Sequence, residues 1–432
     1  MDEIMRKRIL IIGANGFIGQ ALLIHLHAMG HRVTGCVRDA KRFPRHLHTI
    51  RVVEADYTTH TSADQWLPLV QGFDVVINAV GIIRERGASS FEQIHTRGPI
   101  MLFDAALAAG VKRIVQISAL GSDITAVTPF HLSKRAADAH LAESDSDWLI
   151  LRPSLVYGNG GKSSMLFKAV AALPLIPVAG DGSQPVQTVA VEDLAHIVAS
   201  FIEGKFTPRQ YLDVVGAKAI SIREMFGLYR QWLGLSKPRF ISIPERPALW
   251  LAHRLGLFGI ATSSDETVAL LRRGSTADVK RLMQQTGIAP SPMDEALMRS
   301  PAQQADCWHA RLYFLHPLLR SVLGIMWIWT ALISAGIYPI EKSMALLAAV
   351  GLSGPLAVAA LCSGVLLDLL TGLAFLLRVH VKAAAWIQIA AMTTYTLIIT
   401  SALPEYWLHP FGPIIKNLPL AVATLILIAM EA

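Results

Sequence analysis

Two patterns of apolar residues divide the chain near residue 310. Before that point, short apolar runs such as Ile9–Ile12 alternate with stretches of helical periodicity such as Gln20–Met29. Short apolar runs bounded by turn residues are typical of strands that are buried on both faces of a parallel sheet. The strands expected on this basis cover residues 9–12, 31–37, 49–54, 74–77 and 113–117. Their alternation with helices predicts an α/β fold with a doubly wound parallel sheet.

After residue 310 the apolar positions become nearly continuous. The candidate membrane-spanning helices cover residues 318–336, 354–377, 383–402 and 414–430. A crossing needs about 20 apolar residues, so the first three stretches are long enough. The fourth depends on Lys416 reaching the membrane interface. We therefore expect a soluble domain over residues 1–310, with a substrate-side lobe at about 159–300, followed by an all-α four-helix transmembrane domain over residues 311–432.

Composition and charge agree with a membrane protein that has an ordinary soluble half. Hydrophobic residues make up 53% of the chain and charged residues only 16%, against about 25% charged residues in an average soluble domain. The formal net charge is +7, but the chain has no dense Lys/Arg run and no zinc-ligand spacing. We therefore expect no nucleic-acid partner and no metal site. The three cysteines also lack metal or redox spacing, which fits a reducing compartment.

The N-terminal residues predict on which side of the membrane the soluble domain lies. A few charged residues are followed at once by the expected strand at 9–12, which is too short for the apolar core of a signal peptide. With four spans, more of the flanking basic residues would face the cytoplasm than the outside, in agreement with the positive-inside bias. We therefore expect a multi-pass protein of the inner (cytoplasmic) membrane, with the Rossmann-type half and both termini in the cytoplasm.

A glycine-rich motif follows the first expected strand and opens the first expected helix. The motif consists of Gly13, Ala14, Asn15, Gly16, Phe17, Ile18 and Gly19. Glycines at this spacing permit a tight turn and a close approach of the backbone to a pyrophosphate, which the N–H groups of the helix N-terminus then bind. Strand, motif, helix and second strand in this order predict a Rossmann-type dinucleotide site.

The end of the second strand predicts which dinucleotide is bound. An acidic residue there is typical of NAD(H) binding, whereas this chain has Arg38, with Arg42 four residues later. A guanidinium can bind a 2′-phosphate bidentately. This favours NADP(H), with NAD(H) as the alternative; in a third interpretation both arginines are only solvated loop charges. Further cofactor contacts are expected where the third and fourth strands end, at Asp56, Tyr57, Ala79, Val80 and Gly81.

The soluble half resembles the short-chain dehydrogenase/reductase superfamily. The matching segments are residues 13–19, 105–113, 118–121 and 151–158. More narrowly, it is similar to the atypical branch that contains NDUFA9-like accessory subunits of complex I and NmrA-like proteins. The resemblance implies a catalytic Tyr-x-x-x-Lys pair with a serine from the preceding strand. Lys134 and Ser118 match that pattern, and Lys134 would also bind the cofactor ribose, but Phe130 stands at the tyrosine position and has no proton to transfer.

The membrane half resembles the DoxX-like family, most clearly over residues 404–419. Some relatives of that family are associated with quinone-linked oxidation. The first hypothesis is therefore an NAD(P)-binding oxidoreductase that passes reducing equivalents to a lipophilic acceptor such as a quinone. The second is a non-catalytic dinucleotide-binding redox sensor or assembly factor of a membrane complex, which Phe130 favours. Epimerase-like chemistry ranks third, because it also needs the missing tyrosine. Asp368, inside the second span, has either a functional role or an interhelical hydrogen bond.

Overall fold

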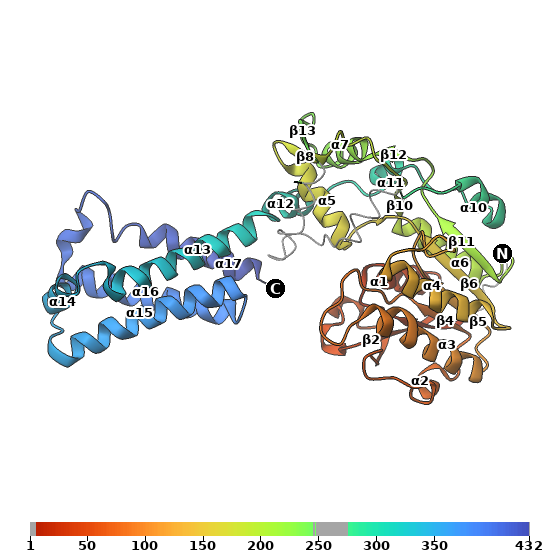
Figure 1. The fold of residues 1–432 in the computed structure, drawn as a ribbon, viewed down its shortest axis with the longest axis horizontal. Coiled ribbons are helices and arrows are strands. Elements are labelled where there is room, and N and C mark those ends of the chain that lie inside the picture. The colour runs from red at the N-terminus through yellow and green to blue at the C-terminus, as the bar shows by residue number, and fades with distance from the viewer. Residues whose placement is uncertain (1–5, 245–246, 248–274, 432) are drawn as a thin grey trace. The chain divides into compact units, whose positions relative to one another are not determined.

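A seven-stranded sheet forms the centre of the first of two compact units, Met1–Ala310 and Arg311–Ala432. The computed structural model describes residues 6–244, 247 and 275–431. The strand order is β11-β6-β5-β4-β1-β2-β3, and every neighbouring pair is parallel (Figure 1). The strands are β1 (Arg8–Ile12), β2 (Arg32–Val37), β3 (Arg51–Glu54), β4 (Val75–Asn78), β5 (Arg113–Ile117), β6 (Asp147–Pro153) and β11 (Gln210–Val214).

Both faces of this sheet are apolar and covered by helices. Successive residues of a strand point to opposite faces, so Ile9 and Ile11 belong to one core cluster while Leu10 and Ile12 belong to another. The first cluster includes side chains of α1 (Phe17–Ala28) and α6 (Val191–Ile202). The second includes side chains of α2 (Ala63–Val70), α3 (Gly98–Ala108) and α4 (Pro129–Ala142). The predicted doubly wound parallel sheet is confirmed.

A smaller lobe follows the sheet in the sequence. It contains the strand pairs β7 (Val156–Tyr157) with β10 (Val189–Ala190), β8 (Ile176–Ala179) with β13 (Phe240–Ile243), and β9 (Pro185–Val186) with β12 (Ile220–Ser221). Its helices within the described residues are α5 (Lys162–Ala172), α7 (Ile222–Trp232), α10 (Val279–Thr286) and α11 (Met293–Arg299). Ser221 and Glu224 form a capping box at the start of α7. Of the lobe expected at 159–300, residues 245–246 and 248–274 lie outside the described residues.

The second unit is helical. Its helices are α13 (Leu315–Leu332), α14 (Ile340–Ala349), α15 (Gly354–Leu377), α16 (Val381–Ala402) and α17 (Asn417–Met430), preceded by α12 (Gln304–Leu312). Within the described residues, three helical segments are long and apolar enough to cross a membrane: Leu315–Ile337, Gly354–Leu377 and Val381–Ala402. The remaining short helical turns in the described part of the chain are Ala40–Arg42, Arg45–Leu47, Glu92–Arg97, Ile333–Ile337 and Pro404–Trp407.

The fourth predicted span differs from the other three. The structure starts α17 at Asn417, which gives a helix of 14 residues. Such a helix is about 21 Å long at 1.5 Å per residue, and the hydrocarbon core is about 30 Å thick. Prolines at 404, 410 and 413 precede it, and a proline interrupts helical hydrogen bonding. α17 is therefore too short to cross the membrane by itself.

Two close contacts define the packing of the helical unit. A Cβ on Gly372 of α15 would lie 2.7 Å from the carbonyl oxygen of Gly324 in α13, so these helices approach backbone to backbone, as small residues permit in membrane bundles. Asp368 is 9% exposed and accepts a hydrogen bond of 3.3 Å from the side-chain amide of Gln388 in α16. The interhelical hydrogen bond that was one interpretation of Asp368 is therefore present.

Candidate functional site

The glycine motif forms a tight turn between β1 and α1. Gly13 has a φ of +82°, and its N–H donates to the carbonyl of Cys36 in β2 at 3.0 Å. The N–H of Gly16 donates to the carbonyl of Gly13 at 2.9 Å. A Cβ on Gly19 would lie only 2.2 Å from that same carbonyl oxygen. Only glycine fits where α1 packs against the turn, as expected for this motif.

The N-terminus of α1 has the features of an anion site. Its N-cap residue is Gly16, no side chain caps the helix, and its first turn contains no acidic residue. The N–H groups of a helix's first turn have no partner inside the helix, and they carry partial positive charge. The arrangement therefore fits the pyrophosphate of a dinucleotide.

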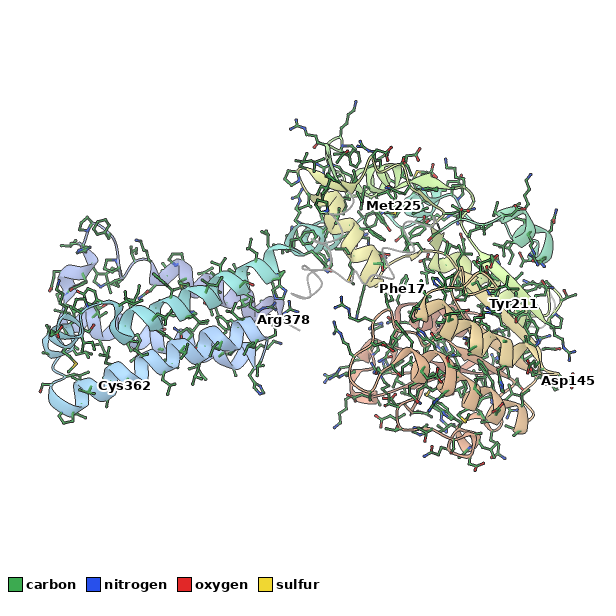
Figure 2. All side chains as sticks on the ribbon, viewed as in Figure 1. Phe17, Asp145, Tyr211, Met225, Cys362 and Arg378 are labelled. Atoms are coloured by element: carbon green, nitrogen blue, oxygen red, sulfur yellow. The ribbon has the colours of Figure 1, made fainter. Side chains whose placement is uncertain are left out.

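The ring of Phe17 links this helix end to the smaller lobe. A Cβ on Gly161, just before α5, would lie 3.1 Å from the ring, and one on Gly158 would lie 3.3 Å from it. Figure 2 labels Phe17 where α1 approaches α5. The glycine-rich loop after β7 is thus held directly beside the start of α1.

The two arginines after β2 have different environments. Arg42 pairs with Asp39, with 3.3 Å between Nε and Oδ2, and Asp39 also accepts the N–H of Lys41. Arg38 is exposed directly after the strand. Because Arg42 already has a carboxylate partner, Arg38 is the arginine at this edge better placed to meet a phosphate.

The predicted contacts after β3 divide into a carboxylate at the surface and a ring in the core. Asp56 is half-buried and accepts the N–H of Thr58 at 3.0 Å. Tyr57 is only 3% exposed, and its ring packs against Gly98 and Trp66. The side chain of Tyr57 is therefore directed into the core, and its backbone is the part that remains near the sheet edge.

The predicted contacts after β4 meet the glycine turn and Lys134. The N–H of Ala79 donates to the carbonyl of Ile12 at 3.0 Å. A Cβ on Gly13 would lie 3.0 Å from Val80, and one on Gly81 would lie 3.2 Å from the Lys134 ammonium. Three segments that are distant in sequence therefore converge at the carboxyl end of the sheet, which is where ligands bind in doubly wound folds.

Lys134 is a buried cation at this edge, with 4% of its surface exposed. Its Nζ donates to the carbonyls of Ile117 at 3.0 Å and Val80 at 3.3 Å. Burial lowers the pKa of Lys134 to about 8, and the nearby carboxylate of Asp138 opposes that shift. An ammonium group with such a pKa can give up a proton near neutral pH.

An aromatic cluster fills the position where the superfamily has its tyrosine. The ring of Phe130 lies 5.1 Å from His131, 5.3 Å from His95 and 5.9 Å from Phe91, measured between centroids. His95 accepts the N–H of Ile82 at Nε2 and lies 3.1 Å from the Ser133 hydroxyl through Nδ1. Burial, followed by the charge of Lys134, lowers the pKa of His95 to about 2. His95 is thus neutral and does not replace the tyrosine as an acid.

Ser118 is bound to a side chain that the sequence argument missed. Its hydroxyl donates to Asp138 at 2.5 Å, and Asp138 also accepts from Gln116 at 3.4 Å and pairs with Arg152 at 3.8 Å. Burial raises the pKa of Asp138 to about 6, although Ser118, Arg152 and Lys134 act in the other direction. The serine hydroxyl therefore belongs to a buried polar network.

That network continues across the sheet edge. The hydroxyl of Tyr57 donates to Asn78 at 3.0 Å, and Asn78 donates to Gln116 at 2.7 Å. Asp138 lies one helical turn after Lys134, which is the sequence signal that could have identified it. The network fixes the ends of β4, β5 and β6 relative to α4, and so it positions Lys134.

Comparison with known families matches both units. Residues 13–203 match a family described as NAD(P)H-binding, and residues 324–425 match the DoxX-like family. The soluble unit thus binds a nicotinamide dinucleotide, and the helical unit is a membrane-type domain.

Individual relatives agree with these matches. The chain is 30% identical over 243 residues to a ceramide reductase of Caulobacter vibrioides, covering 56% of this chain and 74% of that protein. It is 27% identical over 248 residues to the mitochondrial NADH dehydrogenase [ubiquinone] 1 alpha subcomplex subunit 9 of Arabidopsis thaliana, covering 54% of this chain and 60% of the subunit.

Solved structures share the fold of the first unit. The Bordetella bronchiseptica enzyme WbmG in complex with NAD superimposes with a TM-score of 0.52 at 18% identity, over 69% of this chain and 94% of that one. An epimerase of Methanothermobacter thermautotrophicus superimposes with a TM-score of 0.55 at 16% identity, over 72% and 94%. These similarities extend to the fold and carry no information about the reaction.

Proposed function

Since the chain belongs to the NAD(P)H-binding, short-chain dehydrogenase/reductase-like family of Rossmann proteins and carries a DoxX-like membrane domain, we propose that it is a membrane-anchored oxidoreductase that passes reducing equivalents from NADPH to a lipophilic acceptor such as a quinone. The observation that carries the proposal is the buried Lys134 ammonium, which donates to the carbonyl of Val80, the residue that lies against Gly13 of the glycine turn. It puts a proton donor next to the residues that fit the dinucleotide. A membrane domain in the same chain accounts for access to an acceptor dissolved in lipid.

Each part of the site has a role in this proposal. The turn at Gly13–Gly19 and the start of α1 hold the pyrophosphate, and Arg38 binds the 2′-phosphate. NADPH, when bound, supplies a hydride. Ala79, Val80 and Gly81 line the path of the cofactor, and Lys134 binds ribose hydroxyls and donates the proton that the reduced acceptor needs. Ser118 acts indirectly, because its hydroxyl holds Asp138 in place.

Contacts within the helical unit support a topology with both termini on one side. Glu431, just after α17, lies 3.3 Å from Arg320 and 3.2 Å from His316, both in the first turns of α13. The end of α17 is therefore at the same end of the bundle as the start of α13. If α17 and residues 404–416 together complete a crossing, the C-terminus returns to the side of the soluble unit, which we place in the cytoplasm at the inner membrane.

The pH dependence of quinone reduction tests the proposal. Full-length protein in detergent is mixed with NADPH and a short-chain quinone, and loss of nicotinamide absorbance is followed from pH 6 to 10. Because the proton donor is an ammonium with a pKa of about 8, we expect turnover to be highest below pH 8 and to fall about tenfold per pH unit above it. The Lys134→Arg variant stays protonated over this range, so any turnover that it retains should not fall above pH 8. Lys134→Met should abolish turnover. A rate independent of pH across this range would exclude Lys134 as the donor.

A non-catalytic role is the second candidate, and the Phe130 cluster is the observation that favours it. The tyrosine position has no exchangeable proton, and the serine of the superfamily pattern is bound to Asp138. A redox sensor, or an assembly factor of a membrane complex, needs binding without turnover. NADPH binding with no absorbance loss would support this role, provided that a ceramide-type lipid also fails as acceptor. That lipid is included because one relative is named a ceramide reductase.

Replacement of Arg38 tests the preference for NADPH. We expect Arg38→Asp to weaken NADPH binding by about 10- to 100-fold, because a charge-assisted hydrogen bond is worth about 1.5–3 kcal/mol. NADH binding should change little. Arg45→Asp, an equal change of charge at an exposed position nearby, is the matched control in a fluorescence titration. Equal NADPH affinity in the wild type and Arg38→Asp would show that Arg38 is only a solvated loop charge.

A further inference from the structure

α12 is the last helix before the first candidate membrane span, and one of its faces is fixed to the smaller lobe. The carboxylate of Asp306 pairs with Lys168 of α5, with 3.1 Å between Oδ1 and Nζ. Lys168 is only 7% exposed, and its Nζ lies 4.3 Å from the centroid of the Trp232 ring. The thiol of Cys307 donates to the carbonyl of Leu233 at 3.4 Å. This face of α12 is thus held in place by an ion pair and a hydrogen bond.

The opposite face of α12 exposes apolar surface. Trp308 is 60% exposed and Leu312 is 39% exposed. Residues four positions apart lie on the same side of a helix, so these two side chains form one apolar ridge. At about 100° per residue, the ridge lies across the helix from Asp306 and from buried Ala310. A tryptophan that is this exposed beside a second apolar residue is typical of a surface that contacts lipid or protein.

The charges of α12 suit an anionic surface. Asp306 is the only acidic residue of this helix, and Lys168 already neutralises it on the inner face. Arg311 is exposed and lies about 100° around the helix from Leu312, at the side of the ridge. A basic residue next to an exposed tryptophan is typical of segments that lie among the lipid headgroups at a cytoplasmic membrane surface.

The chain keeps α12 close to the bilayer. α12 ends at Leu312, and the first candidate span begins at Leu315. The two linking residues reach only about 7 Å when they are extended. Charged side chains near the end of a span lie at the level of the headgroups. His316 and Arg320, which both contact Glu431, place that level in the first turns of α13.

We propose that α12 lies in the headgroup layer of the bilayer, with Trp308 and Leu312 in contact with lipid, and that it thereby holds the smaller lobe at the membrane surface. An indole has an apolar body and one N–H donor, which suits the boundary between acyl chains and water. Because the inner face of α12 is bound to Lys168, the lobe stays with the helix. This surface requires a helical unit placed in a membrane, and it requires neither turnover nor a bound dinucleotide.

A protein partner fits this ridge less well than lipid does. A stable protein–protein interface buries about 800 Å² on each side, whereas one large aromatic side chain buries about 150–250 Å². One tryptophan and one leucine do not approach the area that such an interface needs. Contact with lipid needs no comparable area, because the spans already anchor the chain in the membrane.

Fluorescence quenching on full-length protein in lipid nanodiscs tests the proposal. Cys307→Ser and Cys362→Ser remove the accessible thiols, and buried Cys36 is kept. A fluorophore is then attached in separate variants to Trp308→Cys, Leu312→Cys or Met283→Cys. Met283 gives the matched control, because it is an apolar residue of α10 with 42% exposure. One quencher is a nitroxide carried by a lipid, and the other is iodide in the water.

The two quenchers distinguish lipid, water and protein as the surroundings of the ridge. We expect the lipid nitroxide to quench the labels at positions 308 and 312 at least about fivefold more than the label at position 283, and iodide to show the reverse order. Iodide quenching at position 308 equal to that at position 283 would mean that the ridge faces water. Protection of positions 308 and 312 from both quenchers would mean that protein covers it. Either result overturns the proposal, and agreement between two separately labelled positions guards against a local disturbance at one of them.

Discussion

Gly19→Ala is expected to abolish dinucleotide binding, with a loss of at least about 100-fold in NADPH affinity, which corresponds to about 2.7 kcal/mol. The new Cβ would lie 2.2 Å from the carbonyl oxygen of Gly13. Either the turn or the start of α1 must then move, and the N–H groups no longer point at a common site. Overpacking of this kind also costs about 1–3 kcal/mol of stability. The measurement is a fluorescence titration of NADPH.

Two further variants separate loss of the site from loss of the fold. Gly227→Ala adds a methyl group inside α7, where nothing lies within 4 Å of the new atom, so NADPH binding should be unchanged. Gly16→Asp adds a carboxylate at the N-cap of α1, where a side-chain cap is missing. It should stabilise the helix by a few tenths of a kcal/mol and still repel the pyrophosphate. Wild-type affinity in Gly16→Asp would mean that the pyrophosphate is not bound at α1.

Asp138→Leu is expected to destabilise the soluble unit by about 3–5 kcal/mol, because removing one partner of a buried ion pair leaves the other uncompensated. Asp138 accepts from Ser118 and Gln116 and pairs with Arg152, and it is 1% exposed. Leucine has the same branched shape, with bulkier methyl groups in place of the oxygens, and accepts no hydrogen bond. Thiol labelling of Cys36 in urea reports on this sheet separately from the helical unit, because Cys36 lies in β2.

Asp138→Asn is the matched variant and adds a pH test. The amide can still accept hydrogen bonds, so we expect a smaller loss, of about 1–2 kcal/mol. Burial raises the pKa of Asp138 from 3.8 to about 6. Between these two pH values, the native state therefore keeps a proton that the unfolded state has released. This group therefore stabilises the native state below pH 4 relative to neutral pH, and that contribution is lost as the pH rises through 6. The wild type should show this decline and Asp138→Asn should not; equal profiles would mean that Asp138 is not the titrating group.

The local features of the fold were predictable from the sequence because their causes are local. Ile9 to Ile12 are apolar without interruption, and this indicates a strand with two buried faces before any contact is known. The Gly13–Gly19 motif predicts its own turn, since few other residues fit one. The three long apolar stretches after residue 310 likewise give helices of membrane length.

The roles of individual polar side chains depended on contacts between residues far apart in the chain. Tyr57 was expected to meet the cofactor, but Gly98 leaves room for its ring in the core and Asn78 accepts its hydroxyl. Ser118 matched the superfamily pattern, yet Asp138 binds it. No periodicity or spacing reveals such partners, because a buried hydrogen bond depends on the distance between atoms and not on sequence separation.

The sequence by itself determined the parallel sheet, the dinucleotide motif, the membrane half and the missing tyrosine, because each depends on residue type at short spacing. Only the tertiary structure decided that Lys134 contacts Val80, which lies against the glycine turn, and that Asp138 organises the polar network. The physical reason is that burial and convergence are properties of packed elements. They set the pKa of Lys134 and bring Asp138 to the hydroxyl of Ser118, and neither property exists before the elements pack.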